Sequence, residues 1–340
     1  MLQVENRTPF APAIAVFPNK EGIDTLYVVV KATFKLHPRL AIADVPLPPV
    51  LADEYWGDPL SSSLKYASEL HVGKQTTDVV LVGKAWTPTG RPVTETLAVV
   101  SVAGRQKAVR VVGDRFWKRS GFTEPKPFES IPLTFEHAFG GQHLVSQDGP
   151  LLAEERNPVG VGFLGKRSSG EMIGQRLPNL EDPAKPLDRL GDMWTPACFG
   201  YVAPAWLPRR TFAGTYDTAW QRSRAPYLPA DFSPRFFNAA APELTMDRFL
   251  VGGEPVQVSG CSRAGPLRFE IPRCRILGDI TFAGAHERPA FKLETVLIEP
   301  EDNRVCISWR AELPCDKKVL KVEKIAIEAD GIDALAGGQK

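Results

Sequence analysis

The sequence predicts a mostly β protein, with antiparallel, sandwich-like sheets at both ends, a long ordered loop region between them, and few short helices. Three observations lead to this prediction. Alternating apolar and polar residues recur in short runs near both ends of the chain. The 340 residues include 31 prolines and 28 glycines, which interrupt helices. Residues 116–250 hold 15 of those prolines and show no sustained period.

The N-terminal part, residues 1–115, opens with the clearest strand signal, over residues 24–36. Leu26, Val28, Val30 and every second residue after them are apolar, so we expect a half-buried strand with one apolar face. Further strands are expected over 77–86, 93–103 and 107–112. Pro/Gly turns separate these runs, which predicts a meander of short strands.

The C-terminal part, residues 251–340, repeats this style, and we expect it to form one compact unit with residues 1–115. Strands are predicted over 254–259, 267–271, 291–299, 304–310 and 321–328. Residues 300–303 have the composition of a hairpin turn. The last residues, 329–340, are expected to fray.

The central region, residues 116–250, combines its many prolines and glycines with numerous aromatic residues. Aromatic side chains bury about 150–250 Å² each, so they need partners. We therefore expect ordered loops wrapped over, or bridging, the two strand-rich ends. Residues 181–190 could hold a turn or two of helix, although Pro183 and Pro186 lie within them.

Composition narrows the classes of function. Lys and Arg number 41 against 40 Asp and Glu, and this balance argues against a nucleic-acid or lipid-surface partner. Apolar runs are far shorter than a membrane span needs, and the N-terminus has no secretory pattern. Five scattered cysteines fit free thiols in a reducing cytoplasm.

Patterns typical of catalysis or cofactor binding are weak. The glycines of residues 160–165 superficially resemble a dinucleotide fingerprint, but no strand–turn–helix context surrounds them. His137 and His143 flank a glycine-containing loop, yet two imidazoles do not make a metal site. Residues 259–262 are polar and turn-like but lack a nearby histidine. We therefore predict no catalytic residues, no cofactor and no metal, although a Ser–His or Cys–His pair formed by folding stays open.

The richest local feature interleaves aromatic residues with arginines over residues 206–224. Such a stretch can stack on nucleotide bases, form a protein-binding hot spot, or pack a loop core. Its candidate partner-binding or loop-scaffold residues are Trp206, Arg209, Arg210, Tyr216, Asp217, Trp220 and Arg222. We expect Asp217 to anchor the loop by accepting backbone N–H bonds.

Several segments in the same order resemble a known family of bacterial proteins. They include Asn6–Phe10, residues 28–34 and 74–80, Ala138–Gly141, residues 157–163, 177–181 and 214–220, and Leu228–Phe232. Over roughly residues 1–310 the chain resembles domain-of-unknown-function family 2169, whose genes tend to lie beside those of type VI secretion spikes and toxins.

The resemblance implies a cytoplasmic adaptor or chaperone that binds a secreted effector toxin and helps load it onto the VgrG spike protein. Such an adaptor needs no active site, and it could hold the effector by β-augmentation or in an aromatic-lined groove. Two alternatives stay open: a hydrolase-type enzyme with its site in the central loops, and a structural subunit associated with the spike.

Overall fold

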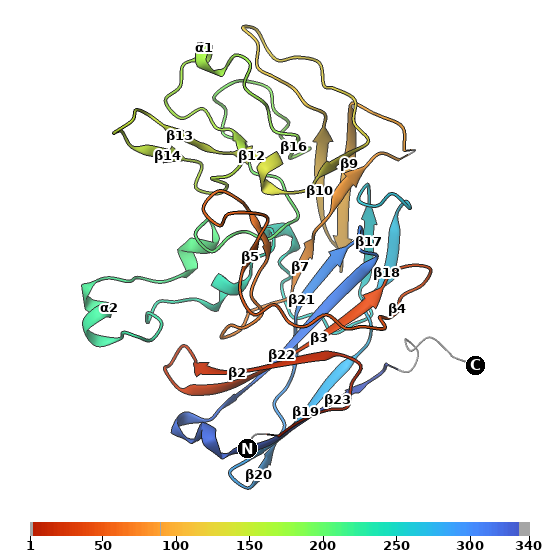
Figure 1. Cartoon of the computed structure of the whole chain (residues 1–340), viewed down its shortest axis with the longest axis vertical. Coiled ribbons are helices and arrows are strands. Elements are labelled where there is room, and N and C mark those ends of the chain that lie inside the picture. Colours follow the sequence, from red (N-terminus) through yellow and green to blue (C-terminus); the bar gives the residue numbers. More distant parts are fainter. Residues whose placement is uncertain (1–2, 89, 333–340) are drawn as a thin grey trace.

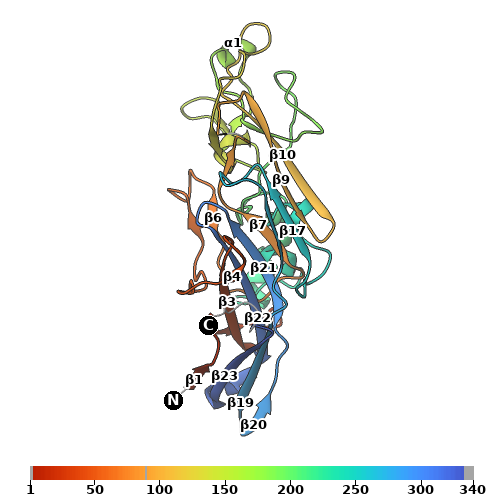
Figure 2. The same cartoon turned by 90° about the vertical axis from the view of Figure 1, so that its right-hand side faces the viewer.

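The computed structural model describes residues 3–88 and 90–332, and it confirms a mostly β fold with few short helices. Strands account for 38% of the chain and helices for 9%. Figures 1 and 2 show an elongated molecule with loops at one end and sheets along the rest. Strands from the two ends of the sequence, red and blue in Figure 1, lie side by side.

The largest sheet has six strands and forms the middle of the molecule. Its order is β2 (Ala11–Pro18), β3 (Asp24–Lys35), β22 (Arg304–Pro314), β21 (Lys292–Glu299) and β7 (Asp78–Leu81), with the short β4 (Ala41–Ile42) paired to β3. Neighbours are antiparallel except β21 and β7, which are parallel. The strand signal over residues 24–36 thus marks a central strand.

Both faces of β3 are buried, so the expectation of a half-buried strand was wrong. Leu26, Val28 and Val30 face the apolar core as expected. The opposite face carries Lys31 and Thr33, each about 4% exposed. The Lys31 Nζ lies 2.9 Å from the Glu69 carboxylate, which gives the buried lysine the polar partner that burial demands.

A five-stranded sheet shares the apolar core with the six-stranded one. Its order is β16 (Leu180–Glu181), β10 (Arg105–Val112), β9 (Glu95–Val102), β17 (Pro255–Ser259) and β18 (Leu267–Glu270). β9 and β10 form the expected hairpin, in which Ala103 and Gly104 both adopt positive φ, as a two-residue turn requires. Inward-facing valines of β9, β10 and β17 pack in one cluster with those of β3, β21 and β22.

A four-stranded sheet closes one end of the molecule, at the bottom of Figure 1. Its order is β1 (Gln3–Asn6), β23 (Val322–Asp330), β19 (Arg275–Phe282) and β20 (Ala285–Glu287). β1 runs parallel to β23 although more than 300 residues separate them. The 3₁₀ helix η5 (Asp316–Lys321) connects β22 to β23.

The prediction of a meander over residues 77–112 is confirmed only for its last hairpin and is wrong for the strands before it. The chain leaves the six-stranded sheet after Leu81, and β8 (Lys84–Trp86) pairs instead with β11 (Ser130–Pro132). A Cβ on the intervening Gly83 would meet the Pro300 ring at 3.4 Å, so the break is closely packed. Two strands, β2 and β19, are absent from the expectation. The alanines and prolines of β2 give no pattern. β19 does alternate, with Ile276, Ile280 and Phe282 on one parity, and this signal was missed.

The central loops are ordered around a second apolar cluster of Trp117, Phe139, Met172, Leu177, Leu187 and Trp194. Short elements punctuate them: η1 (Phe135–His137), β12 (Phe139–Gly140), β13 (Gln142–Leu144), β14 (Leu151–Ala153), β15 (Val161–Gly162), α1 (Ser169–Met172), η2 (Arg209–Phe212), α2 (Thr218–Ser223), η3 (Pro234–Phe237) and η4 (Pro242–Leu244). β5 (Glu54–Tyr55) and β6 (Leu64–Tyr66) form a hairpin beside the six-stranded sheet.

No helix forms over residues 181–190, contrary to the expected turn or two. Glu181 ends β16 and is buried, where its carboxylate pairs with the buried Arg115 and with Arg110. Its Oε2 also accepts the N–H of Leu187 at 3.3 Å. These contacts, together with Pro183 and Pro186, hold the segment as a loop.

Candidate functional site

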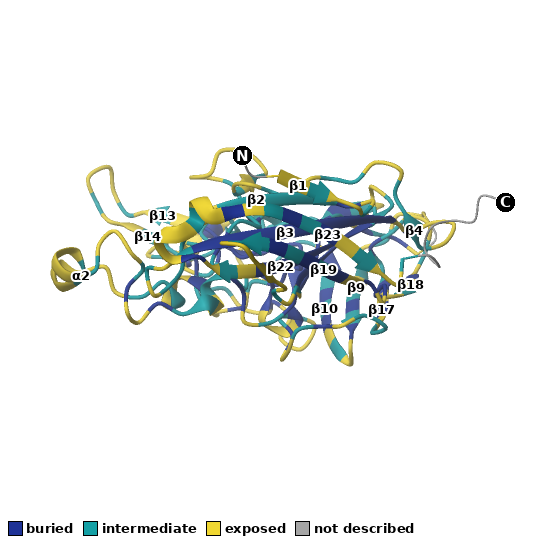
Figure 3. Ribbon diagram, turned by 90° about the horizontal axis from the view of Figure 1, so that it is seen from below, coloured by how far each residue is buried: buried dark blue, intermediate teal, exposed yellow. Residues whose placement is uncertain are grey.

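An arm formed by residues 213–231 projects from the side of the molecule. Figures 1 and 3 show α2 at its tip, away from the sheets, and Figure 3 shows that the tip is exposed. Asp217 precedes α2 and accepts the N–H of Trp220 at 2.8 Å, so it acts as the N-cap of this short helix. Asp217 thus accepts a backbone N–H bond, as expected from its type and position.

The base of the arm is closed by paired contacts between its two ends. Asp231 accepts the backbone N–H of Thr215 at 3.0 Å and its hydroxyl at 2.7 Å. These bonds lower the pKa of the Asp231 carboxyl, because they favour its charged form. Ser233 also donates its N–H to the Phe212 carbonyl at 3.0 Å, so the helices η2 and η3 are tied together below the arm.

The arm also leans on the turn between β2 and β3. The Arg224 guanidinium donates to the Lys20 carbonyl and, through Nε, to the Leu228 carbonyl at 2.8 Å. The Tyr227 ring lies so close to Gly22, which has φ of +86°, that a Cβ there would be 3.3 Å from it. The arm is therefore an ordered segment that is attached to the body at a second place, the β2–β3 turn.

The seven residues predicted as one site divide between the arm and the body. Trp206 is buried and packs edge-on against Phe135 at 5.3 Å, while Arg209 is buried in η2. Arg210 is exposed and pairs with Glu155 at 2.9 Å. The other four residues lie on the arm: Tyr216, Asp217, Trp220 and Arg222.

The aromatic residues of the arm gather on its surface. Tyr216 is 54% exposed and its ring contacts Trp220 edge-on at 4.7 Å. Trp220 is partly exposed, and its indole N–H donates to the Tyr227 carbonyl at 2.9 Å. Arg222 is exposed on the same helix. An aromatic group with an arginine beside it, on a projecting element, is the composition typical of protein-binding hot spots.

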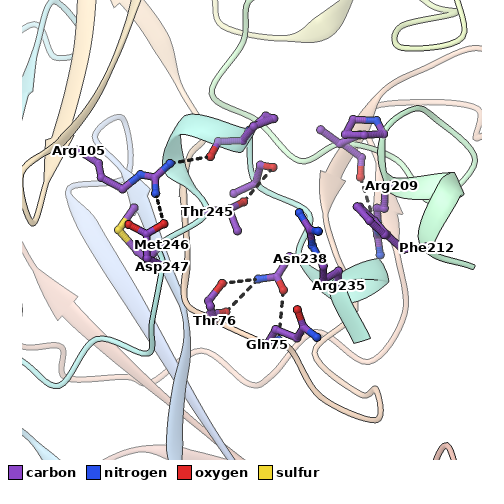
Figure 4. A pocket seen from close by; sticks show the side chains of 14 residues that line it. Gln75, Thr76, Arg105, Arg209, Phe212, Arg235, Asn238, Thr245, Met246 and Asp247 are labelled. Atoms are coloured by element: carbon purple, nitrogen blue, oxygen red, sulfur yellow. Dashed lines mark hydrogen bonds and ion pairs between the residues drawn. The ribbon is translucent and has the colours of Figure 1, made fainter. Parts of the chain in front are cut away.

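A pocket of about 450 Å³ opens at the base of the arm, between η2, η3 and η4; we call it the arm-base pocket. Figure 4 shows Arg209 and Phe212 on one side, Arg105, Met246 and Asp247 on the other, and Arg235 and Asn238 between them. Gln75, Thr76 and Thr245 complete its polar lining, while Val202, Ala240 and Met246 add apolar surface. Of these residues, only Arg209 belongs to the site predicted from the sequence.

Beneath the pocket lies a buried polar layer that the sequence did not reveal. Asp78, fully buried, accepts hydrogen bonds from Lys74 Nζ at 2.7 Å and from Asn238 Nδ2 at 2.9 Å. The Oδ2 atom that accepts from Lys74 also accepts the N–H of Ala239 at 2.8 Å. Asp78 thereby fixes the loop after η3 to the edge of the six-stranded sheet.

The layer continues along the sheet through Arg310 and Glu294, each 4% exposed and 2.9 Å apart. Glu294 sits at a β-bulge in β21, where the register skips from Leu293 to Thr295. A bulge lets neighbouring side chains face the same side, so Glu294 and Thr295 both reach Lys74. Gly73 packs flat against Arg310, and a Cβ there would lie 1.9 Å from the guanidinium.

His71 is buried in the same layer and stacks on Phe237 of η3 at 4.7 Å. Its Nδ1 accepts the Gly73 N–H at 3.1 Å, and its Nε2 lies 3.7 Å from Glu294. Burial, followed by the charges of Lys74 and Arg310, holds the pKa of His71 well below 6.5. The imidazole is therefore neutral, which suits a packing role beneath the arm base.

The two histidines considered for a metal site have separate roles. His137 Nδ1 lies 3.1 Å from Asn179 Oδ1 and 3.2 Å from Arg176 Nη2, and burial lowers its pKa. His143 lies on the β13–β14 hairpin and accepts the Lys166 N–H at 3.0 Å. Across residues 3–88 and 90–332, no group of three or more His, Cys, Asp or Glu side chains is placed to hold a metal ion.

All five cysteines are free and buried. Burial raises the pKa of Cys198, Cys261 and Cys274 to about 12 and that of Cys306 to about 11. Burial also raises the pKa of Cys315. These thiols are therefore protonated at neutral pH and pack as small apolar side chains.

The glycine-rich loop of residues 160–165 serves close packing. The side chain of the buried Asn157 donates to the Phe135 and Phe139 carbonyls at 2.8 and 2.9 Å. A Cβ on Gly160 would lie 2.3 Å from that side chain, and one on Gly140 would lie 2.0 Å from the Asn157 carbonyl oxygen. Absence of a side chain at these positions lets β12 and β15 pair side by side.

These features define a mostly β protein with a projecting aromatic arm and a cationic pocket at its base. The sequence matches the family described as "Uncharacterized protein conserved in bacteria (DUF2169)" over residues 21–310, and the chain belongs to this family. No curated protein and no solved structure matches it. Among the described residues, no helix has the length and apolar character needed to cross a membrane.

Proposed function

We propose that this protein is a cytoplasmic adaptor that binds a type VI secretion effector and helps load it onto the VgrG spike. The arm is the observation that supports protein binding. It holds Tyr216 and Trp220 at the surface, is tied at both ends, and projects clear of the sheets. The secretion part rests on the resemblance to family 2169.

An aromatic docking arm is favoured over strand addition at the edge of the largest sheet. The edge strand β2 has Pro12 and Pro18 at positions of the same parity. Proline has no N–H to donate, and in strands it is found where that side faces away from the ladder. The outer edge of β2 therefore lacks two donors that an added effector strand would need.

Co-expression with the effector encoded beside the gene tests the proposal. An adaptor forms a stable complex, raises the soluble yield of the effector, and stays in the producing cell. Elution of the two purified proteins as separate species at micromolar concentration would contradict it. Appearance of the protein in the secreted fraction would instead support a structural subunit of the spike.

A further inference from the structure

The arm-base pocket contains a buried cation that forms no ion pair with any described residue. Arg209 is 5% exposed. Its Nε and Nη1 donate to the Phe236 and Val202 carbonyls at 2.6 and 2.9 Å. Its guanidinium also lies over the Phe236 ring at 5.1 Å. Its remaining nitrogen, Nη2, has no hydrogen-bond partner, and the guanidinium has no ion pair, anywhere in residues 3–88 and 90–332. Because a buried charge without an ion-pair contact is costly, this arrangement points to a ligand.

Arg235 adds a second cation to the same pocket. Its guanidinium stacks on the Phe212 ring at 4.5 Å and, in the described part of the chain, makes no ion pair. Arg105 differs, since Asp247 pairs with it at 2.6 Å and the Glu243 carbonyl accepts from it at 3.1 Å. Three arginines against one aspartate leave the lining with a net charge of +2.

Two acids favour the charged form of Arg209 electrostatically, Asp53 first and Asp78 second, but within the described residues neither forms an ion pair with it. Asp53 accepts the N–H of Ser68 at 2.8 Å. Asp78 is already bonded by Lys74, Asn238 and Ala239. Asn238 is likewise engaged, since its amide oxygen accepts the Gln75 N–H at 3.2 Å. The pocket thus offers free positive charge at the Arg209 and Arg235 side.

The remaining walls of the pocket are apolar, so they suit an apolar group next to an anionic one. Val202, Phe212, Ala240 and Met246 line the pocket, and its volume of about 450 Å³ is in the range of sites that bury a small ligand. A guanidinium fork matches a planar carboxylate. Asp247 on the facing wall disfavours a more highly charged phosphate.

We propose that the arm-base pocket binds a glutamate or aspartate side chain of a partner polypeptide, flanked by an aromatic or aliphatic residue. This inference rests on the proposed adaptor function and specifies the chemistry that the effector presents. The arm contacts the partner's surface, and the pocket beside it fixes one acidic residue. The carboxylate supplies the ion-pair contact that Arg209 and Arg235 lack within the described residues.

The first experiment titrates the full-length protein with short peptides. Two acetylated, amidated peptide pools with random apolar and aromatic flanks carry either a fixed central glutamate or a fixed central glutamine. The arginine side-chain NMR signals of Arg209 and Arg235 report binding up to millimolar concentration. We expect the glutamate pool to shift these signals. The glutamine pool should bind at least about tenfold more weakly, because it lacks one charge-assisted hydrogen bond.

Arg235→Gln is the matched variant, because this side chain is exposed and its loss leaves the core intact. It is expected to weaken glutamate-pool binding about tenfold. Arg91→Gln, an exposed arginine outside the pocket, makes the same charge change and should have no effect. Equal shifts with both pools, no shift with either, or equal losses in both variants would overturn the inference. Stronger shifts with inorganic phosphate than with glutamate peptides would also overturn it.

The second experiment measures the complex of the protein with the effector. If the complex forms, Arg235→Gln should weaken it about tenfold while Arg91→Gln does not; an unchanged affinity for Arg235→Gln overturns the pocket assignment and leaves the adaptor function standing. If no complex forms, the adaptor function fails, and the peptide titration alone decides whether the pocket takes a carboxylate.

Discussion

Two tryptophans fourteen residues apart show how differently identical side chains are used in this protein. Trp206 is buried against Phe135 in the main core, whereas Trp220 lies partly exposed on the arm beside Tyr216. The first stabilises the fold, and the second is available to a partner. Their positions separate the scaffold from the proposed docking surface within one stretch of sequence.

Replacing Trp206 by Ala should lower the free energy of unfolding by about 3–5 kcal/mol, because it leaves a cavity in the core. Trp220→Ala removes contacts only within the arm, so a much smaller change is expected. Urea denaturation of both variants checks this. A larger loss for Trp220→Ala than for Trp206→Ala would contradict the assignment of the two residues.

His71 makes stability depend on pH in a defined direction. Its pKa in the folded protein lies well below 6.5, so it stays neutral while the same residue in the unfolded chain takes up a proton as the pH falls. The unfolded state then binds more protons, and stability decreases below about pH 6.5 by up to about 1.4 kcal/mol per pH unit. His137, whose pKa is also lowered, adds to the same trend.

His71→Gln removes one of these titrating groups. We therefore expect the unfolding free energy of the variant to fall less steeply between about pH 6.5 and pH 5 than that of the wild type. Denaturant titrations at several pH values measure both slopes. An unchanged slope would show that His71 does not titrate differently in the folded and unfolded states.

At the scale of elements, the polar layer on the second face of the six-stranded sheet organises the site. β3 contributes Lys31, β22 contributes Arg310, and the bulge in β21 aims Glu294 at the loop that carries Gly73 and Lys74. This layer connects the sheet to the arm base through Asp78 and Asn238. The central loops are therefore positioned by buried charges as well as by apolar contacts.

Glu294→Gln tests the strength of this layer. Removing the carboxylate charge leaves Arg310 buried with only the exposed Glu312, 3.2 Å away, and breaking such a pair costs about 3–5 kcal/mol. Glu328→Gln, which loses the exposed pair with Arg7, is the control and should change stability little. Similar melting temperatures for the two variants would contradict the structural importance of Glu294.

The prolines of the edge strand β2 give a second test at this scale. Replacing Pro12 and Pro18 by Thr restores the two missing N–H donors on an edge whose eight residues, Ala11–Pro18, carry no charge. The double variant is expected to associate through this edge, because unpaired and uncharged edges template strand addition. Light scattering across a concentration series measures it, and a variant as monodisperse as the wild type would argue against this reading of the prolines.

The sequence predicts elements well where local pattern decides and poorly where distant partners do. Alternation and a Gly104 turn suffice for β3 and for the β9–β10 hairpin. Burial of Lys31 depends on Glu69, from a segment without any period, and the parallel pairing of β7 with β21 joins residues more than 200 positions apart. No local signal encodes either one.

The same limit applies to the candidate site. Interleaved aromatic and arginine residues located the arm, because such composition is unusual in a loop. The arm-base pocket could not be foreseen, since Arg105, Arg235 and Gln75 come from three separate segments that only folding brings together. Nor could composition tell that Arg209 and Arg210, adjacent in sequence, have opposite exposure.

At the scale of the whole molecule, a β body carries one projecting arm and a cationic pocket at its base, and we propose that both contact a polypeptide partner. The arm is closed by Thr215 and Asp231, so it can be shortened without cutting into either sheet core. This separability allows docking and folding to be measured independently.

Replacing residues 216–230 by a short Gly/Ser linker and titrating the effector by calorimetry tests the central claim most directly. We expect the wild type to bind the effector and the shortened protein to bind it at least about a hundredfold more weakly, because a hot spot is lost. The melting temperature of the shortened protein should be nearly unchanged. Equal affinity of the shortened protein, or no binding by the wild type, would contradict the claim.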